Sequence, residues 1–133
     1  MAYEIPGLKL SLVAGATMTT KQYYAVDVSA STRGYCKIAS DGEQAPFLGI
    51  LQNKPKINQP AEIIFSGVSK AYTDGTVVQD SYICATTDGI ITVATSTEYR
   101  MGWCIDGPTS TGSTGQLLTV LIKALGPSSG LST

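Results

Sequence analysis

The sequence predicts an all-β domain, because its composition and its patterns point the same way. The 133 residues include 14 glycines together with many Thr, Ser, Val, Ile and Tyr residues, a composition typical of short strands joined by turns. Several segments alternate apolar and polar residues with a period of two, as half-buried strands do. No long window carries the apolar stripe of an amphipathic helix. The length suits a single domain with a sizeable core.

The first element that we expect is a strand at residues 8–13, LKLSLV, whose leucines alternate with polar residues. Pro6-Gly7 precedes it, and Ala14-Gly15-Ala16 follows it as a possible hinge. The segment is therefore either the first strand of the core or an arm that pairs with a sheet elsewhere. We predict that the arm binds a partner. The expected division of the chain is an extended N-terminal arm, a β-domain and a flexible tail, at residues 1–16, 17–125 and 126–133.

A β-hairpin is expected next, between residues 24–28 and residues 35–39. Tyr24, Val26 and Val28 recur with a period of two in its first strand, and the polar stretch 29–34 supplies the turn. The second strand ends at the turn that contains Asp41-Gly42.

The stretch from Phe47 to Tyr72, FLGILQNKPKINQPAEIIFSGVSKAY, carries the most information about the fold. Residues 47–51 are apolar on both faces, which is typical of a strand inside a packed barrel or sandwich. Residues 52–60 are polar and contain two prolines, so they are expected to form a surface connection. Residues 61–72 alternate again, and Gly67 interrupts them where a bulge would redirect the chain.

The second half of the sequence repeats the order of parts found in the first half. Residues 35–42 correspond to 82–89 at an offset of 47, residues 49–55 to 102–108 at 53, and residues 61–65 to 118–122 at 57. We expect two related strand-turn-strand units that face each other across one core with pseudo-twofold pairing. The alternative is that Asp-Gly and Gly/Pro turns look alike by chance in β-proteins.

The composition argues against catalysis and against a metal or cofactor site. The sequence contains no histidine, which removes the commonest general base and most transition-metal sites. No pair of carboxylates can be nominated, because the acidic residues are scattered. Those that directly precede glycine are expected to be turn residues rather than glycosidase carboxylates or calcium ligands: Asp41, Asp74, Asp88 and Asp106. We predict no enzymatic activity, no cofactor and no metal.

The cysteines indicate the redox state of the protein's compartment, and the net charge indicates which classes of partner it binds. Cys36, Cys84 and Cys104 are an odd number of widely spaced cysteines beside apolar residues, so we expect buried free thiols in a reducing compartment. A net charge of −1 and a pI near 5.2 argue against nucleic acid and membrane partners. The N-terminus lacks the basic region of a secretory signal, and no stretch approaches membrane-spanning length.

Aromatic residues support one alternative function, a sugar-binding face on a small β-sandwich. The candidates are Tyr23, Tyr24, Tyr35, Tyr72, Tyr82, Tyr99 and Trp103. Most lie in alternating segments next to Val or Ile, where the core or a subunit interface is the expected location. A carbohydrate-binding module is therefore the alternative, and retention of the protein on a polysaccharide would favour it.

Several motifs together carry a family resemblance. They are GILQNKP at residues 49–55, a short proline-containing linker, an AEI-type strand at 61–63, GVSK at 67–70, a downstream Asp-Gly hairpin and a final LLTVLI strand at 117–122. From about Thr19 to Leu125 the chain resembles the small capsid cement or head decoration proteins of tailed bacteriophages and prophages. The loop 92–100, the Ser/Thr-rich loop after Pro108 and the C-terminal tail do not follow the family's pattern.

The resemblance implies a small β-barrel or tulip-like domain and a structural role on the virion. It implies binding to the major capsid protein on the outer surface of the mature head, which the protein stabilises by bridging capsomers after assembly in the host cytoplasm. Self-association as a homotrimer, or as a dimer, is expected, and the 43% hydrophobic content at low charge also favours it. The contact residues that we predict are Tyr3, Ile5, Pro6, Leu8, Leu10, Leu12, Asn53, Lys54 and Pro55.

Overall fold

The computed structural model describes residues 5–95, 97–111 and 116–127, and this part of the chain is all-β, as the sequence predicts. Among these residues no helix is long and apolar enough to cross a membrane. The described residues form nine strands: β1 (Ile5–Ala14), β2 (Ala25–Val28), β3 (Tyr35–Ile38), β4 (Gly49–Leu51), β5 (Pro60–Thr73), β6 (Ile83–Ala85), β7 (Ile91–Val93), β8 (Tyr99–Asp106) and β9 (Gln116–Pro127).

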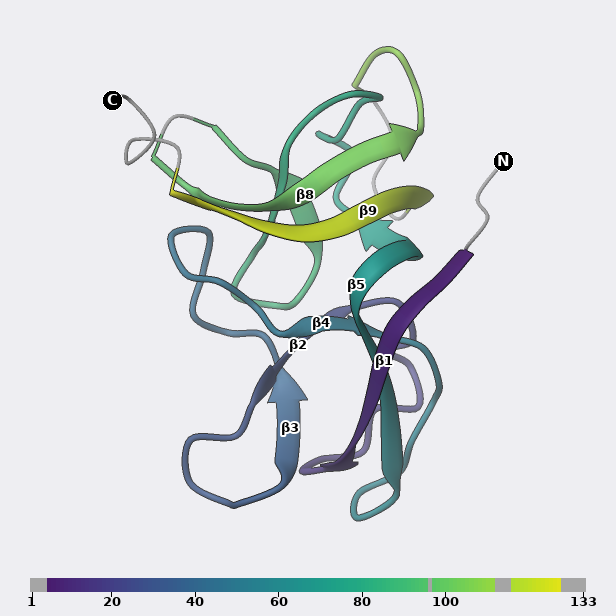
Figure 1. The fold of residues 1–133 in the computed structure, drawn as a ribbon, viewed down its shortest axis with the longest axis vertical. Helices are drawn as coiled ribbons and strands as arrows, with labels where there is room; N and C mark the ends of the chain where they lie inside the picture. The colour runs from purple at the N-terminus through teal and green to yellow at the C-terminus, as the bar shows by residue number, and fades with distance from the viewer. Residues whose placement is uncertain (1–4, 96, 112–115, 128–133) are drawn as a thin grey trace.

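The strand pairings close two rings that share β5. In the first ring, which we call barrel 1, β1 pairs β3, β3 pairs β2, β2 pairs β4, β4 pairs β5, and β5 returns to β1. In the second ring, barrel 2, β5 pairs β7, β7 pairs β6, and β8 pairs β9, which returns to β5; a bridge between Tyr82 and Trp103 joins β6 to β8. Figure 1 shows β1 and β3 in the lower part of the molecule and β8 and β9 in the upper part. The sequence predicted one barrel whose two units share one core; the described residues instead form two barrels, each with its own buried cluster.

Strand β5 is long enough to serve both barrels. Its first half pairs with β1 and β4, and its second half pairs with β9 and, at Thr73, with β7. Gly67 stands at the change of partners with a φ of 124°. The strand continues through this glycine, which permits the change of direction that the sequence pattern indicates.

The two barrels have the same strand register. Val26 pairs Ile38 in barrel 1 as Ile83 pairs Val93 in barrel 2. In the same way, the pairs Ile50–Ile64, Leu12–Ala61 and Ala14–Cys36 correspond to Trp103–Leu121, Ala71–Leu118 and Thr73–Ile91. Even an unusual backbone is repeated: Tyr23 and Asp80 have φ values of 71° and 72°, and their N–H groups donate to the carbonyls of Leu51 and Cys104 at 2.7 Å. The chain therefore contains one structural unit twice.

This register confirms two of the three sequence offsets and corrects the third. The offsets of 53 and 57 relate β4 to β8 and the first half of β5 to β9. The offset of 47 is wrong, because β3 corresponds to β7 and not to β6. The two segments were matched because both end in an Asp-Gly turn, and such turns look alike whichever strands flank them.

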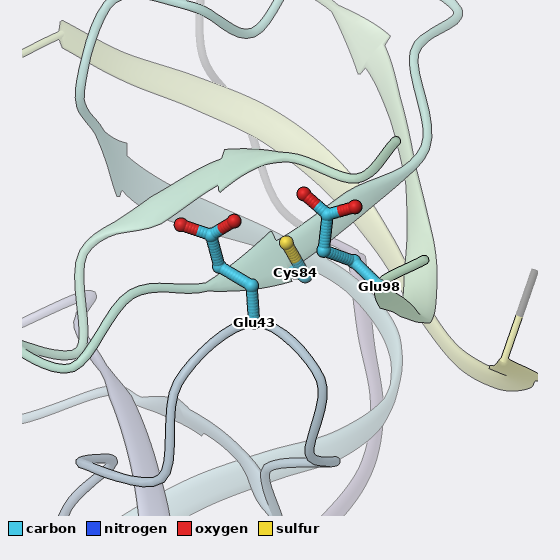
Figure 2. A group of neighbouring side chains, drawn as sticks. All are labelled: Glu43, Cys84 and Glu98. Atoms are coloured by element: carbon cyan, nitrogen blue, oxygen red, sulfur yellow. The ribbon is translucent and has the colours of Figure 1, made fainter. Parts of the chain in front are cut away.

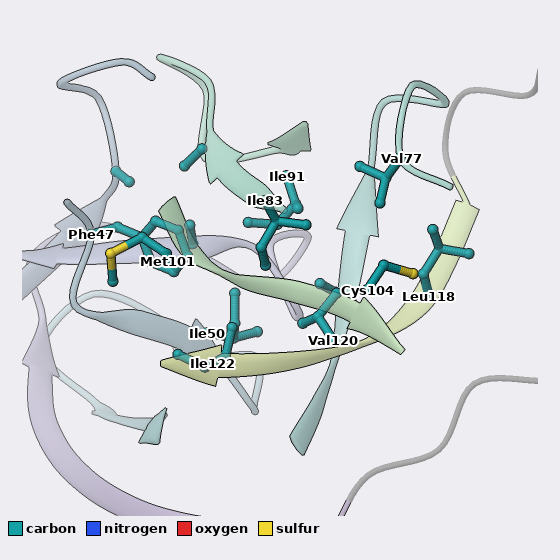
Figure 3. Close-up of a cluster of buried hydrophobic side chains, with 14 residues drawn as sticks. Phe47, Ile50, Val77, Ile83, Ile91, Met101, Cys104, Leu118, Val120 and Ile122 are labelled. Carbon is teal, nitrogen blue, oxygen red and sulfur yellow. The ribbon is translucent and has the colours of Figure 1, made fainter. Parts of the chain in front are cut away.

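Each barrel has a buried interior. Seven buried residues fill barrel 1, with Leu10 and Leu12 packed against them: Ala14, Met18, Val26, Cys36, Leu51, Ala61 and Ile63. The corresponding positions of barrel 2 belong to a second cluster, part of which Figure 3 shows: Val77, Ile83, Ile91, Cys104, Leu118 and Val120. The three cysteines are free and buried, as predicted.

The second cluster also joins the two barrels. Ala25 and Ile50 point away from the interior of barrel 1 and belong to the cluster of barrel 2, and both are fully buried. The β6–β7 turn at residues 86–90 lies against them, since the Ala25 N–H donates to the Gly89 carbonyl at 2.8 Å. One end of barrel 2, formed by this turn and Ala85, therefore packs on a lateral face of barrel 1, formed by Ala25 and Ile50.

Residues 5–14 do not form the separate arm that we expected. They are strand β1, which pairs with β5 from Ile5 to Val13 and with β3 at its end. The N-terminal segment is thus the first strand of the core, the other possibility that the sequence left open. The physical reason is the repeat: β1 occupies in barrel 1 the position that the second half of β5 occupies in barrel 2, and without it barrel 1 would be open.

Candidate functional site

The predicted contact residues of the N-terminal segment have different roles in the structure. Tyr3 lies outside the described residues, and Ile5 and Pro6 are the first two residues of strand β1. Leu10 and Leu12 pack against the core of barrel 1, so the fold itself uses them. Among the predicted residues of this segment whose side chains the structure describes, Leu8 is the exposed one, at 61% of its surface.

Leu8 lies where the pairing of β1 with β5 is irregular. The register between β1 and β5 shifts between Ile5 and Leu8 and again between Leu8 and Lys9. Gly7, Leu8 and Lys9 are all exposed, whereas Leu10 and Leu12, which follow the irregular pairing, pack against the core of barrel 1. Pro6-Gly7 was the sequence signal for this irregularity.

Of the three predicted residues in the connection between β4 and β5, only Lys54 is exposed. Asn53 holds the connection together, since its side chain donates to the Pro60 carbonyl at 3.0 Å and accepts from the Glu62 N–H at 3.1 Å. Pro55 is buried, and its carbonyl accepts from the Met18 N–H at 2.8 Å. Asn53 and Pro55 therefore support the fold, and the side chain of Lys54 is exposed to solvent.

Lys54 lies at the edge of a pocket of about 530 Å³ that we call the tyrosine pocket. It is lined by Thr19, Thr20, Gln22, Tyr23, Tyr24, Lys54, Tyr72 and Leu117. The rings of Tyr24 and Tyr72 stack with their centres 5.2 Å apart. Lys21 Nζ lies 4.7 Å from the Tyr24 ring centre, and Lys70 Nζ lies 5.6 Å from that of Tyr23. Burial, with smaller contributions from Tyr72 and Asp88, raises the pKa of Tyr24, so the phenol of Tyr24 stays protonated at neutral pH.

A second aromatic surface lies on barrel 2, around a pocket of about 400 Å³ lined by Asp80, Tyr82 and Trp103. Tyr82 is 44% exposed, and the Arg100 guanidinium lies 4.6 Å from its ring centre. Tyr82 and Trp103 occupy in barrel 2 the positions that Ala25 and Ile50 occupy in barrel 1. They are the lateral face of barrel 2.

The structure brings together a pair of carboxylates that the sequence pattern did not indicate. Glu43 from the β3–β4 connection and Glu98 from the loop before β8 meet beside Cys84 of β6, and their ligand atoms lie within 4.8 Å of one another (Figure 2). The two glutamates stand far apart in the chain and outside any motif, so only the contact between the barrels could reveal them.

The two carboxyl groups of this cluster influence each other's protonation. A hydrogen bond to Glu98 raises the pKa of Glu43, while the Thr95 hydroxyl, which donates to Glu98 Oε2 at 2.6 Å, lowers the pKa of Glu98. Burial, together with the nearby carboxylates, raises the pKa of Cys84 to about 12, so its thiol stays protonated at neutral pH. We describe Glu43 and Glu98 as a carboxyl pair in which Glu43 holds the proton more tightly.

Comparison with known proteins shows a shared fold. The sequence matches no known protein family and no curated protein. The structure is similar to the crystal structure of the head fiber gp8.5 N base in bacteriophage phi29, with a TM-score of 0.64 and 11% sequence identity. The likeness covers 87% of this chain and 93% of that chain. It includes both barrels, because neither barrel alone makes up that share of the chain.

Proposed function

We propose that this protein is a structural, non-enzymatic component of a bacteriophage virion. In this proposal it binds the major capsid protein on the outer surface of the head and stabilises the mature head by bridging capsomers, after assembly in the host cytoplasm. The observation that carries the proposal is the similarity of the whole two-barrel fold to a phage head fiber base. The resemblance of residues 49–55 and 67–70 to capsid cement proteins supports it from the sequence.

The fold suits a protein that transmits force between two contact points. A protein that bridges capsomers must transmit force between two contact points without chemistry, and β5 runs through both barrels as one strand of 14 residues. Backbone pairing and a buried contact between the barrels resist their separation. Leu8, exposed on β1, is the apolar side chain that we propose for the capsid contact.

No observation favours the carbohydrate-binding alternative. Sugars bind aromatic residues by stacking on a free ring face. In the tyrosine pocket Tyr24 lies between Tyr72 and Lys21, and Lys70 covers Tyr23. On barrel 2, Arg100 covers a face of Tyr82. Cations thus occupy ring faces that a sugar would need.

The proposal is tested by adding the purified protein to undecorated heads and measuring the bound fraction after sedimentation. We expect binding that saturates at a fixed number of copies per capsomer and heads that withstand a higher temperature. Absence of saturable binding, or retention of the free protein on a polysaccharide, would contradict the proposal.

Two matched variants locate the capsid contact. Leu8→Glu should reduce the bound fraction and leave the thermal midpoint within a few degrees, because exposed positions tolerate substitution at a cost of about 0.5 kcal/mol or less. Ile57→Glu, at a position of similar exposure in the connection 52–60, is the control. Loss of binding in Ile57→Glu alone would move the contact from β1 to that connection.

A further inference from the structure

We propose that copies of this chain associate through a repetition of the contact that joins their own two barrels. In the chain, the end of barrel 2 packs on the lateral face of barrel 1. The end of barrel 1, formed by Val28 and the β2–β3 turn at residues 29–34, would pack in the same way on the lateral face of barrel 2 in a second copy. This deepens the proposed function by naming the self-contact on which an oligomeric head protein depends.

The exposure of equivalent residues supports this contact. Ala85 at the end of barrel 2 and Ala25 on the side of barrel 1 are buried between the barrels, at 2% and 0% exposure. Their equivalents are Val28, which is 54% exposed, and Tyr82, which is 44% exposed. The end of barrel 1 and the lateral face of barrel 2 thus expose large side chains at positions where the contact within the chain has alanine. Larger side chains bury more apolar area, as a contact between separate molecules requires.

The turns at the two barrel ends also match. Gly89 and Gly34 each have a φ of 78°, and each stands in the turn before the corresponding strand. A Cβ at Gly89 would lie 2.9 Å from the Ala25 carbonyl oxygen, whereas a Cβ at Gly34 would meet nothing within 4 Å. The end of barrel 1 therefore has the backbone shape that fits a lateral face, and the described part of this chain leaves it open.

One pair of opposite charges matches the same pairing, on a surface that also carries the Arg100 guanidinium beside Tyr82. Arg33 is exposed beside Gly34 at the end of barrel 1, and Asp80 is exposed beside Tyr82 on the side of barrel 2. In the chain's own contact the Gly89 turn lies next to Tyr24 and Ala25, which correspond to Ser81 and Tyr82. The repeated contact would place Arg33 close to Asp80, with opposite charges. Because the two surfaces differ, the contact is head-to-tail and forms a closed ring or a chain of copies.

The test measures the mass of the purified full chain by light scattering and native mass spectrometry over a wide concentration range, without heads. We expect a multiple of 13.9 kDa for the natural sequence. Val28→Glu should raise the concentration needed for assembly by about tenfold or more, as loss of a central apolar contact does. Ile57→Glu, at 53% exposure, should assemble as the natural chain does. Thermal unfolding checks that each variant is folded.

A charge reversal identifies the partner surfaces. Arg33→Asp and Asp80→Arg should each weaken assembly, and the double variant Arg33→Asp/Asp80→Arg should restore it. The proposal is overturned if the natural chain is monomeric throughout, if Val28→Glu and Ile57→Glu behave alike, or if the double variant is no better than the single ones. A monomer whose binding to heads is lost in Val28→Glu would assign these surfaces to the capsid protein, which also overturns it. Failure to bind heads leaves this test unaffected.

Discussion

Alanine at Gly102 should destabilise the protein more than alanine at any open glycine. A Cβ at this position would lie 1.8 Å from the Leu121 carbonyl oxygen on the paired strand β9, and the φ of Gly102 is 143°. Carbon and oxygen normally approach to about 3.3 Å, so β8 and β9 must separate by roughly 1.5 Å here. Overpacking costs about 1–3 kcal/mol and the backbone conformation about 1–3 kcal/mol more, which together give about 2–6 kcal/mol. We take the middle of this range, about 3–5 kcal/mol.

Thermal unfolding followed by circular dichroism measures this effect. For a chain of this size, about 3–5 kcal/mol corresponds to a fall of roughly 10–20 °C in the midpoint. Gly34→Ala is the matched control, because that glycine has a positive φ and no neighbour within 4 Å, and it should cost only about 1 kcal/mol. The equivalent position in barrel 1, Gly49, has its Cβ 2.3 Å from the Ile64 carbonyl oxygen, so Gly49→Ala should also exceed the control. A Gly102→Ala midpoint equal to that of Gly34→Ala would refute the close approach and with it the register of β8 on β9.

Three further outcomes are expected. Deletion of residues 2–13 should unfold barrel 1 or lower the midpoint of thermal unfolding by more than about 10 °C, because each leucine removed from the core costs about 1.5–3 kcal/mol. A midpoint within a few degrees of that of the full chain would mean that the fold does not need β1. The three cysteines should react slowly with a thiol reagent in the native protein and fast in urea, because burial raises the pKa of each thiol. A rapid reaction of Cys84 in the native protein would contradict its buried position. Glu43→Gln should raise the stability of the protein at pH 7 and have little effect below pH 4.5. The pKa of Glu43 is raised in the folded state, so the natural protein loses stability as the pH rises through that pKa, and glutamine avoids this loss. A difference in thermal midpoint that does not depend on pH would disprove the shared proton.

Local patterns predicted the elements whose neighbours are close in sequence. The hairpin of β2 and β3 and the buried strand β4 are found where alternation and apolar runs placed them. Asp41-Gly42, Asp74-Gly75 and Asp88-Gly89 have glycines with positive φ, as turns require. These features depend on a few adjacent residues, so the sequence displays them directly.

The errors concern contacts between distant segments. The strand at 8–13 has the same alternation whether it is an arm or a core strand, and only the long edge of β5 made it a core strand. The exposure of Leu8 accompanies the irregular pairing of β1 with β5, which the local alternation does not show. The offset of 47 failed because three- and four-residue strands carry too little pattern to outweigh similar turns.

The sequence by itself determined the all-β class, the turns, the buried thiols and the presence of a repeated unit, because periodicity and glycine positions encode local geometry. Tertiary structure decided that the units are two barrels sharing β5, that Glu43 meets Glu98 beside Cys84, and that Val28 and Tyr82 remain exposed where their equivalents are covered. The physical reason is that closing a barrel and stacking one barrel on another join residues far apart in the chain. Which face then stays open depends on how many units are present to cover one another.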